Sequence, residues 1–231
     1  PLTPPVEGTD LVIFSDIKNY VAQWDNQNFL ASCKKYAQSY GVYLLTSRVV
    51  ADGYLCLFLF DDKGKIIGGQ RAVSLNLSYR GTLSRSTDLN IVRTKFGNLF
   101  LAVDVDIYRP EILRAAALSG AEIILSSQFI PLYDYQSQKL GQLAFQAADN
   151  GVYIVNVSNA STSVIAPVET ASCPGGFLVR EDDSVPLFYS LDTGLYKKSS
   201  DPASPLARLR PALYEKYASY LGRGSLCCLS N

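Results

Sequence analysis

The stretch FGNLFLAVDVDIYRPEILRAAALSGAEIILSS, residues 96–127, indicates the class of the fold. Residues 99–103 place aliphatic or aromatic side chains on both faces of an extended chain, which is typical of a strand buried on both sides. Two carboxylates, Asp104 and Asp106, follow where this strand is expected to end. A buried strand that ends in two acids marks this point as a candidate functional position.

A helix and a second buried strand complete the stretch. Pro110 and Glu111 fit the first turn of a helix, and Gly120 fits its end. The apolar run after Gly120 then predicts another strand over residues 121–129. This strand–helix–strand order predicts an α/β protein in which helices cover sheets.

The rest of the chain continues the alternation of strands and helices. Strands are expected over residues 10–14, 42–50, 90–106, 152–158, 163–167 and 186–192, with a hairpin over residues 52–73. Helices are expected over residues 26–41, 135–151 and 205–222. No linker or repeat divides the chain, so residues 1–231 are expected to form one domain, with a peripheral tail from about residue 203.

Composition excludes several classes of function. The 21 basic residues balance 21 acidic ones, which gives no electrostatic case for nucleic acid, and no apolar run reaches the ~18 residues of a membrane span. Histidine is absent, so imidazole-based hydrolases and histidine metal sites are excluded, and no cofactor or metal set is predicted. The five cysteines are an odd number without paired spacing, which favours reduced thiols in a cytoplasmic protein.

Polar residues follow three of the expected strands. Asp16 follows the first strand, Asp104 follows the strand described above, and residues 126–128 follow the next one. Loops at strand ends hold functional groups in many α/β proteins. Each of these residues taken singly is typical of a helix cap or a turn, whereas convergence of the three at one edge would make a site. Asp106 precedes the Pro110 helix and is expected to be structural.

Four segments in this order resemble the nitrilase, or carbon–nitrogen hydrolase, superfamily. They are EGTDLVIFSD, GKIIGGQRAVSL, TKFGNLFLAVDVDIYRPEILRAAALSGAEIILSS and LAFQAADNGVYIVNVSN. The third is the most specific, because Gly97, Asp106, Pro110, Glu111 and Gly120 fall in one unbroken register. The resemblance implies a four-layer αββα sandwich of the nitrilase type, here lacking the family's first strand and helix, which are expected ahead of Pro1.

The resemblance also implies a catalytic triad, and each of its positions is substituted here. Asp16 stands at the position of the family's general base Glu, Ala72 at that of its Lys, and Asp104 at that of its nucleophilic Cys. The Lys position is the only one for which another alignment register is considered. That register would place Lys63 or Lys65 at this position instead of Ala72.

Two facing carboxylates without the lysine raise an electrostatic problem. At ~4 Å and an effective dielectric near ~20, ionising both costs about 4 kcal/mol. Three outcomes would relieve this cost. One Asp keeps its proton, a metal or a ligand amine lies between the two, or Arg71, Arg109 or another basic side chain neutralises them.

Three functions follow as alternatives. The leading one is a catalytically degenerate family member that binds a small, amine-containing ligand or acts in assembly; its candidate ligand-binding residues are Asp16, Asp104, Tyr108, Gln128 and Phe129. The second is an amide or nitrile hydrolase with a rearranged carboxylate site, supported by Tyr108 or Ser126 and favoured by a divalent cation. The third is a partner subunit, in a homodimer or with an active homologue, docked through the helix 110–120.

Overall fold

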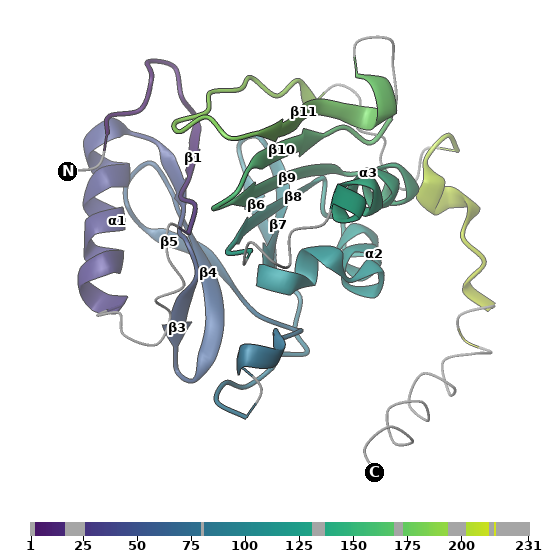
Figure 1. The fold of residues 1–231 in the computed structure, drawn as a ribbon, viewed down its shortest axis with the longest axis horizontal. Helices are drawn as coiled ribbons and strands as arrows, with labels where there is room; N and C mark the ends of the chain where they lie inside the picture. Colours follow the sequence, from purple (N-terminus) through teal and green to yellow (C-terminus); the bar gives the residue numbers. More distant parts are fainter. Residues whose placement is uncertain are drawn as a thin grey trace.

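Two β-sheets pack face to face, with helices on both outer sides (Figure 1). The computed structural model describes residues 3–16, 26–79, 81–130, 137–168, 173–193, 202–212 and 215. The layers are helix, sheet, sheet and helix, as the resemblance predicted. The strand and helix expected ahead of Pro1 lie outside the described residues.

The first sheet is mostly antiparallel and lies beside one helix. Its strands are β1 (Leu11–Ile13), β2 (Tyr43–Leu45), β3 (Val49–Ala51), β4 (Tyr54–Phe60) and β5 (Ile66–Arg71). Strand β1 is an edge strand that pairs in parallel with β2, whereas β2, β3 and β5 pair antiparallel with β4. Helix α1 (Asn26–Tyr40) buries Cys33 and Ala37 against the outer face of this sheet.

The second sheet has a parallel centre. Its strands are β6 (Ile91–Thr94), β7 (Gly97–Val103), β8 (Ile123–Gln128), β9 (Tyr153–Ser158), β10 (Thr162–Ile165) and β11 (Phe177–Asp182). Strands β7, β8 and β9 run parallel, so their carboxyl ends meet at one edge of the sheet. Helices α2 (Pro110–Leu118) and α3 (Ser137–Asn150) cover its outer face.

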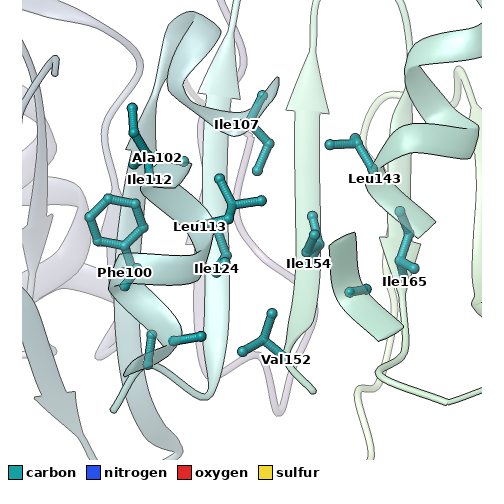
Figure 2. Packing of buried hydrophobic residues seen from close by; sticks show 14 of the residues in the cluster. Phe100, Ala102, Ile107, Ile112, Leu113, Ile124, Leu143, Val152, Ile154 and Ile165 are labelled. Atoms are coloured by element: carbon teal, nitrogen blue, oxygen red, sulfur yellow. The ribbon is translucent and has the colours of Figure 1, made fainter. Parts of the chain in front are cut away.

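The alternation seen in the sequence explains the burial of β7 on both faces. Leu99, Leu101 and Val103 belong to the core between the sheets. Phe100 and Ala102 point to the opposite face, where they pack with residues of α2 and α3 (Figure 2). The prediction of a strand buried on both sides is therefore confirmed, and this packing fixes where the chain leaves the sheet at Asp104.

The segment expected as one strand over residues 42–50 is two strands. Thr46, Ser47 and Arg48 separate β2 from β3. The hydroxyl of Thr46 accepts a hydrogen bond from the Phe58 backbone N–H at 3.0 Å, and the side chain of Arg48 turns toward buried carboxylates. The Thr46 hydroxyl therefore takes one of the two hydrogen bonds of the Thr46–Phe58 pair, while the Thr46 N–H still donates to the Phe58 carbonyl at 3.0 Å.

The expectations for the last third of the chain are partly wrong. Residues 186–192 are not a strand, because β11 takes the place beside β10 instead. Of the helix expected over residues 205–222, the described part contains a 3-10 turn, Pro205–Arg208, and three further helical residues, at 211, 212 and 215. No helix in the described part of the chain has the length and apolar character needed to cross a membrane.

Candidate functional site

Asp104 lies at the tip of β7 in an unusual backbone conformation. Its φ is 52°, in the left-handed region, and it begins a 3-10 turn that ends at Tyr108. Asp tolerates this region better than most residues, but such a conformation persists only where the surroundings enforce it. The turn sets the Asp104 carboxyl at the carboxyl edge of the parallel strands, where only 2% of the residue is exposed.

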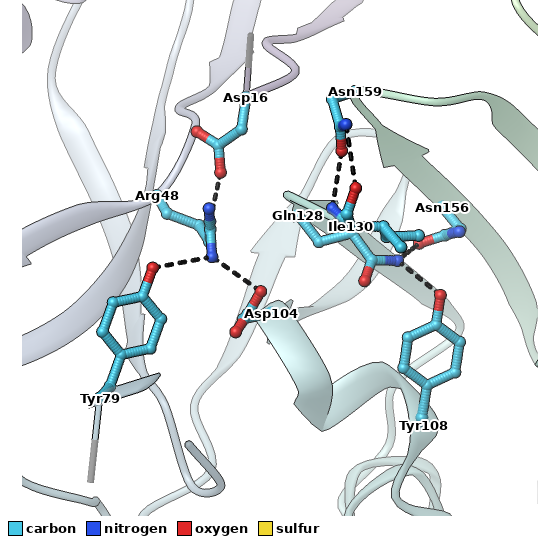
Figure 3. A network of polar contacts seen from close by, with 9 residues as sticks. All are labelled: Asp16, Arg48, Tyr79, Asp104, Tyr108, Gln128, Ile130, Asn156 and Asn159. Carbon is cyan, nitrogen blue, oxygen red and sulfur yellow. Dashed lines mark hydrogen bonds and ion pairs between the residues drawn. The ribbon is translucent and has the colours of Figure 1, made fainter. Parts of the chain in front are cut away.

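A buried arginine joins the two carboxylates (Figure 3). Arg48 Nε donates to Asp16 Oδ2, and Arg48 Nη1 donates to Asp104 Oδ1 at 2.8 Å. Each of the three side chains is at most 3% exposed. The predicted convergence of Asp16 and Asp104 is thus found, with an arginine between them that the sequence analysis did not single out.

Two aromatic side chains complete the surroundings of Arg48. The Tyr79 hydroxyl accepts a hydrogen bond from Arg48 Nη1 at 3.4 Å, and the Arg48 guanidinium carbon lies 5.9 Å from the centre of the Phe129 ring. An aromatic face at this distance stabilises a cation electrostatically. Phe129, a predicted ligand-binding residue, is therefore already a neighbour of a cation within the chain.

One guanidinium faces two carboxylates in this cluster. Burial alone lowers the pKa of Arg48, but the charges of Asp104 and Asp16 more than reverse this, so its pKa is raised and the side chain stays charged. Burial raises the pKa of Asp104; Arg48 opposes the rise and Asp16 adds to it. Burial likewise raises the pKa of Asp16 against the effect of Arg48. The cluster therefore holds protons more tightly than two exposed aspartates do.

Two buried oxygens near the strand ends accept no hydrogen bond from the described residues. They are Oδ2 of Asp104 and Oγ of Ser126. A buried polar atom without a partner costs about 1–3 kcal/mol, and such atoms are rare in folded proteins. Asp104 therefore uses one carboxylate oxygen for the ion pair and leaves the other for a proton or for another group.

A second polar cluster lies beside the first, on β8 and β9. The Gln128 side-chain amide donates to the Tyr108 hydroxyl at 3.0 Å and to Asn156 Oδ1 (Figure 3). Further along the same edge, Asn159 Oδ1 accepts from the Ile130 backbone N–H at 2.6 Å. The predicted residues Tyr108 and Gln128 therefore lie close to one another, and both are engaged within the chain.

Ala72 adds no polar group to the site. It is fully buried in the core between the sheets, and its neighbours Val73 and Ser74 donate their backbone N–H groups to the carboxylate of Asp106, at 2.9 and 2.6 Å. Asp106 thus ties the segment after β5 to the turn after β7, as its expected structural role requires. Burial raises the pKa of Asp106 to about 7, although the two backbone N–H groups oppose the rise.

The basic residues considered from the sequence lie away from the carboxylates. Arg71 forms a long ion pair of 3.9 Å with Asp52 and lies over the Tyr54 ring, and Arg109 is exposed. Lys63 and Lys65 are exposed in the β4–β5 turn, seven or more residues before Ala72, which corresponds to about 20 Å along a strand. The register with Lys63 or Lys65 at the triad position therefore receives no support from the geometry.

The described thiols are not arranged as nucleophiles. Cys33, Cys56 and Cys173 are buried thiols. Burial raises the pKa of Cys33 to about 12 and that of Cys56 to about 11, whereas a reactive thiol needs a pKa below its ordinary value. Cys227 and Cys228 lie outside the described residues. Within the described ranges, no group of three or more Cys, Asp or Glu side chains is arranged to hold a metal ion.

Arg48, Tyr79 and Asn156 are the site residues that sequence reasoning missed. Arg48 offered one signal: it is the only charged residue in the otherwise apolar and neutral segment 42–50. A charge inside an apolar strand calls for a buried partner of opposite sign.

Comparison with known proteins identifies the fold. The sequence profile of the carbon-nitrogen hydrolase family matches residues 8–187. The chain belongs to the carbon–nitrogen hydrolase family. A comparison with curated proteins gives no match.

Solved structures of this family share the architecture. A Cys-to-Ala variant of the Nesterenkonia sp. AN1 amidase, from the nitrilase superfamily, is 15% identical with a TM-score of 0.68, over 91% of this chain and 84% of that one. The same amidase in complex with butyramide is 17% identical with a TM-score of 0.57, over 66% of this chain and 62% of that one. A carbon-nitrogen hydrolase from Helicobacter pylori G27 is 21% identical with a TM-score of 0.61, over 76% and 74% of the chains. At these identities the likeness shows the fold alone.

Proposed function

We propose that this chain is a non-hydrolysing member of the carbon–nitrogen hydrolase family that acts in binding or assembly. The resemblance aligns Asp16, Ala72 and Asp104 with the Glu, Lys and Cys that carry out the family's reaction. A thiolate attacks the amide or nitrile carbon, an ammonium stabilises the developing negative charge, and a carboxylate moves protons. In this chain two of the three groups have no chemical equivalent.

The observation that supports this proposal most directly is the position of Arg48. Its guanidinium contacts both carboxylates in a buried cluster, so these acids serve an internal ion pair. A carboxylate nucleophile at Asp104 would form an anhydride, with no lysine at residue 72 to meet the oxyanion. Loss of one oxyanion donor alone typically costs ~10²–10³ in rate.

An assay of purified protein tests the proposal. Ammonia release is measured with short aliphatic amides, including butyramide, and with the corresponding nitriles. We expect no turnover above the blank for the unchanged chain or for Asp104→Ala. Turnover that Asp104→Ala abolishes, and that the exposed control Asp183→Ala leaves intact, would overturn the proposal.

A second function, hydrolysis by a rearranged carboxylate site, is favoured by one observation. Asp104 holds a buried carboxylate oxygen without a hydrogen-bond partner, at a residue with positive φ. Such a carboxyl could act on a substrate, with Tyr108 or Ser126 as a further polar group. Oxygen ligands suit Mg²⁺ or Ca²⁺, so calorimetric titration with either ion separates this function from the first.

The expected ligand with an amine group would share the carboxylates with Arg48. Its ammonium would meet the same two carboxylates, and Asp104 Oδ2 is the acceptor that Arg48 leaves available. A small ammonium group that bonds this oxygen, without displacing Arg48, is the ligand that the cluster would accept most readily.

Assembly is supported by the outer face of α2 and α3. Leu118 is 58% exposed and Phe145 is 65% exposed on these two helices. By contrast, Ala116 and Ala117 pack inward on the sheet, so they do not supply a small-residue docking face. A homodimer, or a complex with an active homologue, would cover Leu118 and Phe145. The reduced thiols of Cys33, Cys56 and Cys173 fit a cytoplasmic setting for this assembly.

A further inference from the structure

The Asp16–Arg48–Asp104 cluster contains two acids and one base (Figure 3). Arg48 donates to one oxygen of each carboxylate, and all three side chains are at most 3% exposed. One guanidinium balances one carboxylate, so ionising both acids would leave a net negative charge in a buried site. A buried charge without a partner is costly in a folded protein. The cluster therefore needs one further positive charge, which a proton or a bound cation can supply.

The elements packed around Asp104 do not supply this charge. In the described part of the chain, Arg48 is the basic residue that pairs with Asp104. The other titratable groups that act electrostatically on Asp104, or on which it acts, are Asp16, Tyr79, Asp106 and Tyr108. Burial raises the pKa of both tyrosines, so their hydroxyls stay neutral, and Asp106 is a further acid.

One atom of the cluster is placed to take the missing charge. Asp104 Oδ1 accepts from Arg48 at 2.8 Å, whereas Asp104 Oδ2 is buried and bonds to no described residue. Burial raises the pKa of Asp104, and the charge of Asp16 adds to the rise, so a proton is held readily at this oxygen. The same oxygen is the acceptor that a ligand ammonium would use.

Two partly exposed aromatic residues lie beside the buried cluster. Tyr79 bonds to Arg48 through its hydroxyl, and the Phe129 ring lies 5.9 Å from the guanidinium carbon. The cluster therefore approaches the surface beside two aromatic rings, whose faces attract cations. Because the charged side chains are themselves buried, an ammonium group that reaches Asp104 Oδ2 must be small.

We propose that a proton and a small primary ammonium ligand compete for Asp104 Oδ2, which makes ligand binding dependent on pH; this rests on the proposed binding function of the same cluster. In the free chain, Asp104 is a carboxylic acid. When the ligand binds, the Asp104 O–H bond breaks, the proton passes to the solvent, and Oδ2 accepts a hydrogen bond from a ligand N–H. The summed charge of cluster and ligand inside the fold is zero in both states, and the ion pairs of Arg48 persist.

Infrared difference spectroscopy of the purified chain tests for the proton itself, because a carboxylic acid has a C=O band that a carboxylate lacks. Spectra are recorded near neutral pH with and without methylammonium chloride. We expect methylammonium to remove a carboxylic acid band and to add carboxylate bands. The same difference should be absent from Asp104→Asn.

Calorimetric titration with methylammonium chloride tests the competition. Measurements in two buffers with different ionisation enthalpies give the number of protons released. We expect about one proton per bound ligand at low pH, and an affinity that rises by up to about tenfold per pH unit. The affinity should level off at a pH above the pKa of Asp104, because the free carboxylate then holds no proton.

Two variants and a second probe separate this site from general attraction of cations. Asp104→Asn removes the competing carboxyl, so it should weaken methylammonium binding at least about tenfold and release no proton. Asp183→Asn changes an exposed acid and should alter neither the affinity nor the proton release. Tetramethylammonium has no N–H to donate and should bind at least about tenfold more weakly than methylammonium. Circular dichroism checks that both variants fold.

Several results would overturn the proposal. Methylammonium binding that releases no proton at any pH, or that a folded Asp104→Asn variant retains in full, would reject the competition and leave a binding role for the chain. A lack of methylammonium binding across the pH range would also reject it, and would leave assembly as the proposed function. Failure of the proposed function itself has a different sign, namely amide turnover that Asp104→Ala abolishes.

Discussion

Arg48 Nη1 donates to Asp104 Oδ1 across 2.8 Å, and this contact joins the two sheets of the sandwich. Arg48 comes from the break between β2 and β3, and Asp104 comes from the tip of β7. A buried ion pair is weak evidence for added stability. Removing one partner, however, leaves the other charge unpaired in a low-dielectric site, which strongly destabilises the fold. The predictions below follow from this asymmetry and from the neighbouring groups.

Arg48→Met is expected to lower the free energy of unfolding by about 3–5 kcal/mol, because it leaves two buried carboxylates without a cation. Urea unfolding monitored by circular dichroism measures the change. Arg71→Met is the matched control: Arg71 is half exposed, its ion pair with Asp52 is long, and its loss should cost less than about 1 kcal/mol. Equal costs for the two variants would show that Arg48 and its carboxylates are not a coupled buried cluster.

Asp104→Val and Asp104→Asn are expected to differ. Asn retains a side chain that tolerates positive φ and can accept from Arg48, whereas Val is β-branched and apolar. Val should therefore destabilise the fold by at least about 2 kcal/mol more than Asn does. Thermal unfolding of both variants measures this difference, and similar melting temperatures would argue against enforced strain at residue 104.

The titration of the Asp106 carboxyl should make the stability of the fold depend on pH. Its pKa is raised to about 7 in the folded chain, from 3.8 in the unfolded one, so the folded state holds the proton more tightly between these values. As far as this group is concerned, stability is therefore greatest near and below pH 4, falls by up to about 4 kcal/mol as the pH rises from about 4 to about 7, and levels off above that.

Urea midpoints measured from pH 5 to pH 8 test this prediction. Asp106→Asn should be less stable than the unchanged chain, since an amide cannot accept from both Val73 and Ser74 N–H groups, and its stability should vary less with pH. A slope that is the same in both proteins would assign the titration to Asp16 and Asp104 instead.

If the chain assembles through the outer faces of α2 and α3, substitutions on these faces should lower the mass of the assembly and leave the fold of the chain unchanged. Leu118→Lys together with Phe145→Lys should convert a dimer to a monomer in light scattering, because both side chains are more than half exposed and lie in the proposed interface. Leu77→Lys, at a residue 71% exposed in another part of the molecule, should leave the mass unchanged. A monomer before any substitution would remove the basis for a homodimer through this face.

The sequence predicted those parts of the fold that depend on local periodicity. Residues 96–127 contain the two-sided burial of β7, the Pro110 start of α2 and the turn at Gly120, and the structure has all three. The convergence of Asp16 and Asp104 was also predictable, because both follow strands. Asp106 could be assigned a structural role from its place before α2.

The contacts that depend on pairing between distant strands could not be predicted in this way. Thr46 and Ser47 are compatible with a strand, so the strand break was not predictable from them. The charge of Arg48 indicated a buried partner but not which one, because its partners lie 32 and 56 residues away. Strand β11 was missed because its charged end, Arg180 to Asp182, disrupts the apolar pattern. Residues 186–192 were predicted as a strand because this segment has the apolar pattern that the charged end of β11 lacks.

The location of Arg48 constrains any attempt to re-engineer hydrolysis into this scaffold. Placing cysteine at residue 104 and lysine at residue 72 would add an ammonium to a core that already holds a guanidinium, while removing one of the acids that balances it. Hydrolytic activity can be introduced here only if Arg48 is replaced in the same design. Each substitution made alone is therefore expected to destabilise the protein. A route to a nucleophilic enzyme is therefore epistatic, because Arg48 has to change together with residues 72 and 104.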